Sequence, residues 1–225
     1  MRFSRGTFGL AAAMLAVSWT PATAAGTAWR GDFVGRLEAL ALLQSLNADL
    51  LSHDSATLTL DRWCGAHGLA SPAKIVAELV GDDKRPGDEE RRNLGVGPSE
   101  PVNYRHVRLR CGEHVLSEAD NWYVPGRLTP EMNHQLETTD IAFGRAVQAL
   151  GFRRRTLSAK LLWSPLPDGW DTAGEAPHGT GTPLVPAPRV IEHRAVLTRA
   201  DGTPFSEVVE SYTDEVLAFA EPPRP

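Results

Sequence analysis

Two charged residues lie where a β-strand pattern places apolar side chains. Alternate residues of an extended strand share a face, so Arg105 lies on the same face as Val107. In a later strand Glu210 lies between Val208 and Tyr212 on one face. A charge on an apolar face is costly unless an ion partner or a charged ligand meets it. Arg105 is therefore either half of a structural ion pair or the anchor of an anionic ligand.

Arg105 and Glu210 together would suit a small amphiphilic ligand. The guanidinium can bind a carboxylate through two hydrogen bonds, and the glutamate can accept one from a hydroxyl group. The sequence contains no G-x-S-x-G motif, no P-loop and no H-E-x-x-H motif. We expect no cofactor, and no metal site, because the two cysteines have no histidines clustered around them.

Cys64 and Cys111 are the only cysteines in the chain. In an oxidising compartment such a pair can form a disulfide. Free cysteines are also among the most buried residue types, so two buried thiols are the alternative. The sequence leaves both alternatives open.

Residues 1–24 have the pattern of a signal peptide. Arg2 and Arg5 precede an apolar run from Phe8 to Trp19, and Ala22-Thr23-Ala24 is an A-x-A cleavage site. We therefore predict cleavage near Ala24 and a periplasmic or secreted product. The apolar run is too short for a permanent span, and we expect no membrane span after cleavage.

The remaining chain has the size of one domain, which we place at residues 25–220. The protein has 225 residues and a formal net charge of −5. Its basic residues are scattered, which argues against nucleic-acid binding. We expect a monomer.

Alternation of apolar and polar residues predicts most of the strands, and i, i+3, i+4 spacing predicts the helices. We expect strands over residues 104–111, 115–124, 152–163, 190–199 and 205–213. Helices are expected over residues 33–51, 55–64, 73–80 and 130–136. Hairpins join the strands, and long helices do not alternate with them. The fold class is therefore α+β, a single antiparallel sheet with helices covering one face.

Three segments lack periodicity. Residues 81–101 are predicted to be a solvated loop that could act as a flap. Residues 164–189 are rich in proline and glycine and are predicted to form an irregular insertion. Residues 221–225 are predicted to be a disordered tail.

Short motifs along residues 35–215 occur in an order that resembles the chorismate pyruvate-lyase family, whose members split chorismate into 4-hydroxybenzoate and pyruvate. The motifs are Ser55-Ala56-Thr57, Tyr104-Arg105 with the strand end at Cys111, Leu116, Val124-Pro125, the helix end at Leu136, Thr139 to Arg145, and Val209-Glu210. The chain departs from the family in its signal peptide, in its 164–189 insertion, and in Ala142, which replaces a proline. Asn121-Trp122-Tyr123 adds bulk beside the hairpin.

The resemblance implies a six-stranded antiparallel sheet, with helices on one side and flaps over a buried site. It implies that Arg105 binds the substrate carboxylate and that Glu210 meets the ring hydroxyl or takes part in proton transfer. It also places Phe143, Gly144 and Ala56 against the ligand. These roles require no metal and no cofactor.

Three functions are compatible with the sequence. The first is an exported carbon–oxygen lyase acting on chorismate or a related cyclic enol-pyruvyl carboxylate. The second is a non-catalytic periplasmic protein of the same fold that binds an aromatic or other small carboxylic acid. The third is a structural or interaction protein that has kept the sheet and lost the pocket, because a fold does not determine a function.

Overall fold

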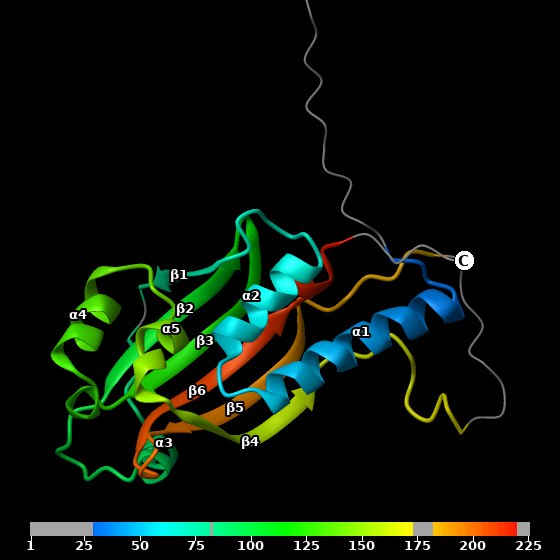
Figure 1. The fold of residues 1–225 in the computed structure, drawn as a ribbon. Helices are drawn as coiled ribbons and strands as arrows, with labels where there is room; N and C mark the ends of the chain where they lie inside the picture. The colour runs from blue at the N-terminus through cyan, green and yellow to red at the C-terminus, as the bar shows by residue number, and fades with distance from the viewer. Residues whose placement is uncertain (1–28, 82, 173–181, 220–225) are drawn as a thin grey trace, which may run out of the picture.

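The computed structural model describes residues 29–81, 83–172 and 182–219. In this part of the chain six strands form one antiparallel sheet in the order β1-β2-β3-β6-β5-β4 (Figure 1). The strands are β1 Ile75–Val80, β2 Asn103–Cys111, β3 His114–Tyr123, β4 Arg153–Leu161, β5 Arg189–Thr198 and β6 Pro204–Thr213. The α+β class with a single antiparallel sheet is thereby confirmed.

Three predicted segments fall wholly or partly elsewhere. The predicted signal peptide at residues 1–24 and the predicted tail at residues 221–225 lie outside the described residues. The middle of the 164–189 segment does so too. The described ends of that segment are irregular, as expected, but they pack against the domain, because Leu166 and Leu184 are buried.

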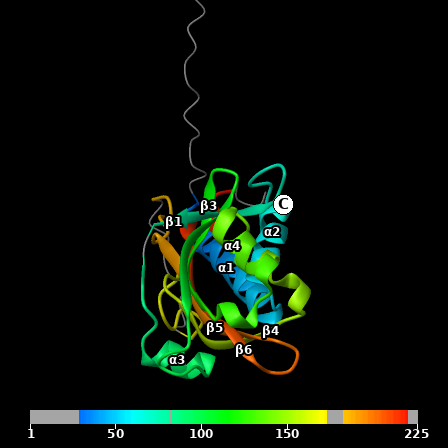
Figure 2. The same ribbon diagram turned by 90° about the vertical axis from the view of Figure 1, so that its left-hand side faces the viewer.

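Most helices cover one face of the sheet. These are α1 Phe33–Ser52, α2 Ala56–Ala66 and the short α5 Phe143–Ala146, while α4 Pro130–Thr138 lies at one end of the sheet (Figures 1 and 2). Helix α1 buries one stripe of side chains, which belongs to the same apolar core as residues of β5 and β6. The predicted helices at 33–51, 55–64 and 130–136 are thus confirmed.

Helix α2 starts where the sequence signal places its first residue. The Ser55 side chain accepts a hydrogen bond from the Leu58 backbone nitrogen at 3.4 Å. Serine is a favoured residue at this position because it satisfies a backbone donor that has no partner within the helix. This cap fixes the start of α2 against the inner face of the sheet.

The segment predicted as a helix over residues 73–80 is a strand instead. Strand β1 pairs with β2 in a register that sets Ile75 opposite Cys111. Ile75 and Ala77 point into the core, which is the alternation of a half-buried strand. A short apolar run cannot be distinguished from a buried helix by periodicity alone, and this ambiguity explains the error. The strand supplies the sixth member of the sheet.

The predicted loop at 81–101 contains a helix, α3 Asp88–Leu94, that packs on the opposite face of the sheet. Leu94 joins Trp122 and Val124 in a separate apolar cluster. Arg194 of β5 is paired with both Glu89 and Glu90 of α3. Helices therefore cover parts of both faces, and the prediction of cover on one face only was incomplete.

Cys64 of α2 and Cys111 of β2 form a disulfide, with Cα atoms 6.4 Å apart. This separation lies within the range that disulfide geometry allows. Both residues are fully buried. The bond settles the alternative that the sequence left open and ties α2 to the end of β2.

Candidate functional site

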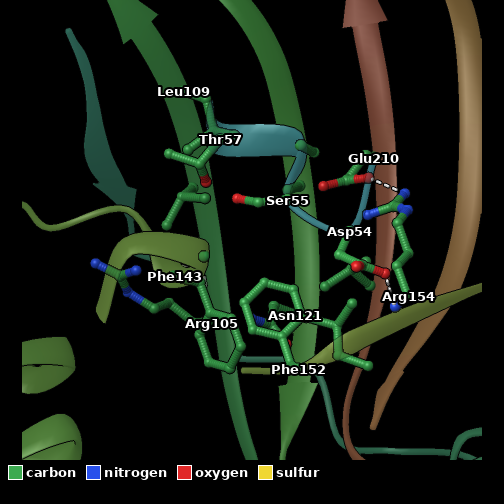
Figure 3. Close-up of a pocket in the computed structure, with 16 residues that line it drawn as sticks. Asp54, Ser55, Thr57, Arg105, Leu109, Asn121, Phe143, Phe152, Arg154 and Glu210 are labelled. Carbon is green, nitrogen blue, oxygen red and sulfur yellow. Dashed lines mark hydrogen bonds and ion pairs between the residues drawn. The ribbon is translucent and has the colours of Figure 1, made fainter. Parts of the chain in front are cut away.

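A narrow pocket lies between the inner face of the sheet, the start of α2 and the turn into α5 (Figure 3). Its free space is about 40 Å³, which corresponds to roughly three water molecules. The structure brings together all five residues predicted at the site. They are Ala56, Arg105, Phe143, Gly144 and Glu210.

Arg105 reaches the pocket from β2, and only 5% of its surface is exposed. Among the described residues, none of its three guanidinium nitrogens has a hydrogen-bond partner. Burial lowers the pKa of Arg105, and the nearby Tyr123 opposes this shift only in part. The expected structural ion pair is therefore absent from the described part of the chain, and the charge of Arg105 is left without compensation there.

Arg105 also borders a second, more open hollow. This hollow has about 420 Å³ of free space and is lined by the segment after β1 and by the end of α4. Lys84 and Arg85 lie on its wall together with Glu137. Arg105 therefore sits between the narrow apolar pocket and a wider, more polar space.

Asn121 of β3 lies directly opposite Arg105 in the β2–β3 register. It is 3% exposed and lines the same pocket. Its Oδ1 accepts a hydrogen bond from the Ser206 hydroxyl at 2.6 Å. Its Nδ2 has no partner within the described ranges.

Glu210 of β6 and Arg154 of β4 form a buried ion pair on the other side of the pocket (Figure 3). The distance from Arg154 Nη2 to Glu210 Oε2 is 2.5 Å. Tyr212 donates its hydroxyl proton to the same oxygen at 3.1 Å. The second carboxylate oxygen points toward Ser55 and the pocket (Figure 3). Glu210 therefore keeps one oxygen available to a ligand.

Burial and charge shift the pKa values of this group. Burial is the largest single effect and lowers the pKa of Arg154, but the charge of Glu210, its hydrogen bond to Arg154, and the effects of Tyr212 and Asp54 together outweigh burial and raise the pKa. Burial, followed by the charge of Glu210, raises the pKa of Tyr212 well above its ordinary value. Tyr212 is therefore a neutral hydrogen-bond donor at physiological pH.

Gly144 allows α5 to approach α2 closely. A Cβ atom at this position would lie 2.9 Å from both Ser55 Oγ and Thr57 Oγ1. Real Cβ atoms do not approach other atoms this closely, so any side chain here would force the side chains of Ser55 and Thr57 to shift. The glycine thus keeps the hydroxyls of Ser55 and Thr57 at the pocket wall.

Sequence reasoning missed Arg154 and Asn121. Arg154 belongs to the run Arg153–Arg155, in which the one inward-facing arginine has an arginine on each side. Its position two residues after Phe152, on the same strand face, was a signal that alternation could have revealed. Asn121 offered no comparable signal, because its inward orientation depends on the register with β2.

The charged residues that line the pocket are Asp54, Arg105, Arg154 and Glu210, and their formal charges sum to zero, but Arg105 has no partner among them. Glu210 neutralises Arg154, and Asp54 is paired with Arg153 at 3.0 Å. Arg105 is the remaining charge that the described residues leave uncompensated. A monoanion would neutralise it, whereas a dianion would leave a buried negative charge.

Residues 29–81, 83–172 and 182–219 provide neither a metal-binding cluster nor a membrane-spanning helix. The described residues contain no group of three or more histidine, cysteine or acidic side chains that could hold a metal ion. Within those ranges every helix is too short or too polar to cross a lipid bilayer.

Comparison with known proteins identifies a relative at high identity. The chain is 62% identical over 196 residues to uncharacterized protein y4mC of Sinorhizobium fredii (strain NBRC 101917 / NGR234). The match covers 86% of this chain and 83% of y4mC. The chain belongs to the y4mC family. No family model matches it.

Solved structures resemble the y4mC-family chain more distantly. PhnF of Mycobacterium smegmatis has a TM-score of 0.47 and 16% identity, covering 77% of this chain and 70% of PhnF. A GntR-family regulator of Enterococcus faecalis V583 has a TM-score of 0.39 and 13% identity, covering 66% of this chain and 99% of the regulator. The possible regulator YydK of Bacillus subtilis has a TM-score of 0.39 and 16% identity. That match covers 67% of this chain and 62% of YydK.

These comparisons correct the predicted family and activity. YydK and the Enterococcus faecalis protein carry the names of transcriptional regulators, an effector domain of PhnF has a solved structure, and none of these names is that of a lyase. The prediction of an exported enzyme of the chorismate pyruvate-lyase family was therefore wrong. The solved structures also give no support to the predicted signal peptide or to the predicted periplasmic location. The cellular location stays a prediction.

Proposed function

We propose that the protein binds a small organic carboxylate in the pocket between α2, α5 and the sheet. The observation that carries the proposal is the buried guanidinium of Arg105, which has no partner among the described residues. An uncompensated buried charge is costly, and structures retain one mainly where a ligand or a catalytic function requires it. A bound carboxylate would pair with Arg105 through two parallel hydrogen bonds.

The wall of the pocket supports a ligand with an apolar body. Most of the wall is apolar, and it includes Val107, Leu109, Phe143, Phe152, Leu197 and Val208. Ligand pockets in proteins commonly combine such a wall with a few polar groups that fix orientation. A carboxylate on a compact ring or branched chain matches this combination. The free space is narrow, so a ring would require the walls to part.

Glu210 supports a second polar group on the ligand. Its Oε2 is engaged by Arg154 and Tyr212, while the other oxygen faces the pocket. A hydroxyl or amine at the far end of the ligand could donate a hydrogen bond to that oxygen. The proposed ligand class is therefore a small carboxylate with a hydrogen-bond donor opposite the carboxyl group.

The proposal is tested with a panel of small acids and their neutral counterparts. Acetate, benzoate, 4-hydroxybenzoate, benzamide and inorganic phosphate are titrated into the purified protein at pH 7, with the melting temperature and binding heat as readouts. We expect at least one carboxylate to raise the melting temperature, because a ligand that binds only the folded state stabilises it. Benzamide and phosphate should leave it unchanged.

Variants of two arginines on the same strand provide the control. Arg105→Gln should abolish the response to the carboxylate. Arg108→Gln should retain it, because Arg108 points to the other face of β2 and its side chain is 43% exposed. A protein that responds to none of the carboxylates up to millimolar concentration would refute the proposal. Equal responses in the two variants would do the same.

A further inference from the structure

We infer that Asn121 is a second binding residue for the anionic group, acting beside Arg105. The inference rests on the proposed function and adds a residue that determines which anion the site selects. Two side chains, one charged and one neutral, would then share the carboxylate. The argument depends on how the two strands place these side chains.

Arg105 and Asn121 are cross-strand neighbours. They face each other in the antiparallel register of β2 and β3. Directly opposed residues of such a pair have Cβ atoms roughly 4.5–5.5 Å apart and point to the same face of the sheet. Both side chains line the pocket, and both are at least nine-tenths buried. The Arg105 guanidinium extends away from Asn121 (Figure 3), so a carboxylate would have to lie between the two side chains to accept hydrogen bonds from both.

Ser206 sets the orientation of the Asn121 amide. Its hydroxyl donates to Asn121 Oδ1 at 2.6 Å, which uses the acceptor end of the amide. The donor end, Nδ2, is then left inside the pocket without a partner among the described residues. A buried donor without a partner is uncommon, and its position beside Arg105 suggests that a ligand supplies the acceptor.

The combined donors suit a carboxylate. A carboxylate offers about four lone-pair sites on two oxygens, and an arginine fork occupies two of them. The Asn121 amide can donate to a third without adding charge. One positive charge together with one neutral donor therefore balances a monoanion, whereas a phosphate dianion would remain under-compensated.

The substitution Asn121→Asp tests whether the side chain at this position faces the Arg105 guanidinium. The introduced carboxylate would lie opposite Arg105, pair with it and take the place of the ligand. We expect benzoate affinity to fall at least 100-fold, while the melting temperature stays unchanged or rises. A lower melting temperature would instead show that the aspartate does not reach Arg105, because the buried amide would then be replaced by an uncompensated charge.

Two further variants complete the design. Asn121→Leu removes the donor without adding charge and should weaken benzoate binding by about tenfold to a hundredfold, the usual range for a hydrogen bond to a charged group. Asn133→Asp is the control, because Asn133 lies on α4 and does not line the pocket. It should leave benzoate affinity unchanged. The affinities are measured by titration calorimetry, and the melting temperatures without ligand.

Different experimental results would refute the role of Asn121 and the proposed binding of a carboxylate. If the wild-type protein binds benzoate and Asn121→Leu binds it equally well, the role of Asn121 is refuted and the proposed function stands. If the wild-type protein binds no carboxylate, the proposed function fails. The melting temperature of Asn121→Asp then still decides whether the amide faces Arg105. A fall refutes that arrangement, and a rise supports it.

Discussion

At the scale of single residues, the buried charge of Arg105 lowers the stability of the folded protein and leaves a positively charged group available in the pocket. Arg105 is buried, and the described residues provide no partner for its guanidinium. Arg154, on the other side of the pocket, has a partner for its charge, because it forms an ion pair with Glu210. Two arginines of similar burial therefore differ in their partners, and under the proposed function the unpaired Arg105 binds the ligand.

The substitution Arg105→Met should stabilise the protein in the absence of ligand. It replaces an uncompensated buried charge with an apolar side chain of similar length, and we expect the free energy of unfolding to rise by about 1–3 kcal/mol. Urea denaturation at pH 7 measures this change. Arg108→Met serves as the control and should alter stability little. A clear loss of stability in Arg105→Met would show that the guanidinium has a structural partner.

His193 should make the free energy of unfolding depend on pH. It is fully buried and bonded to Asn47, and burial lowers its pKa despite the nearby charge of Glu210. Below the ordinary pKa of about 6.5, the unfolded chain therefore binds a proton that the folded chain does not. The contribution of His193 to the free energy of unfolding is fully present above that pH and is lost as the pH falls. Between pH 7.5 and 5.5 the loss from this residue should reach at most about 1.4 kcal/mol.

Urea denaturation at the two pH values tests this dependence. His193→Gln should reduce the stability difference between pH 7.5 and pH 5.5. His134→Gln, at an exposed position on α4, should leave it intact. His67→Gln is also compared, because burial lowers the pKa of His67 and acts in the same direction. An unchanged difference in His193→Gln would contradict the assignment.

At the residue scale, the sequence identified pocket residues where apolar and polar side chains alternate regularly along a strand. Arg105 and Glu210 could be identified because each interrupts an apolar face, and the structure places both at one pocket. Arg154 was hidden because its two neighbours are also arginines. The pairing of Arg154 with Glu210 depends on the order of strands in the sheet, which local pattern does not specify.

At the scale of elements, hairpins and capped helices were predictable, whereas two segments after α2 were not. Strand β1 has an apolar run too short to show its period. Helix α3 is almost wholly polar, so it has no apolar stripe that a pattern could detect. Its position comes from contacts with distant residues, such as the ion pairs of Arg194.

The close approach of α5 to α2 predicts the effect of Gly144→Ala. The added methyl group would meet Ser55 and Thr57 at 2.9 Å and push apart two walls of the pocket. We expect a loss of about 1–3 kcal/mol in stability and weaker carboxylate binding. Gly126→Ala is the matched control, because a Cβ atom there meets nothing within 4 Å. Thermal denaturation and benzoate titration measure both effects, and equal behaviour of the two variants would refute the packing argument.

The disulfide joins two elements that both line the pocket. Cys64 belongs to α2 and Cys111 to β2, with 47 residues separating them in sequence. Replacing both by alanine should lower the free energy of unfolding by about 2–4 kcal/mol, because the unfolded chain loses a constraint. Urea denaturation measures the loss, and reductant should have no further effect on the variant. Wild-type protein that alkylates fully without reductant would contradict the bond.

At the scale of the whole molecule, the fold class was predictable because short turns join β2 to β3 and β5 to β6, which indicates antiparallel hairpins. The location of the protein in the cell stays a prediction. A buried disulfide is typical of proteins from oxidising compartments, which agrees with the signal-like pattern of residues 1–24. Our expectation of a monomer also stays a prediction.

The strand order gives the pocket a role in folding kinetics. Strands β1 to β3 form one meander and β4 to β6 another, and only the β3–β6 pairing joins them within the sheet. Arg105 and Asn121 belong to the first meander, while Arg154 and Glu210 belong to the second. A ligand in contact with both groups would bridge this seam after each meander has formed. Its main effect would then be to slow unfolding, with little change in the rate at which the chain folds.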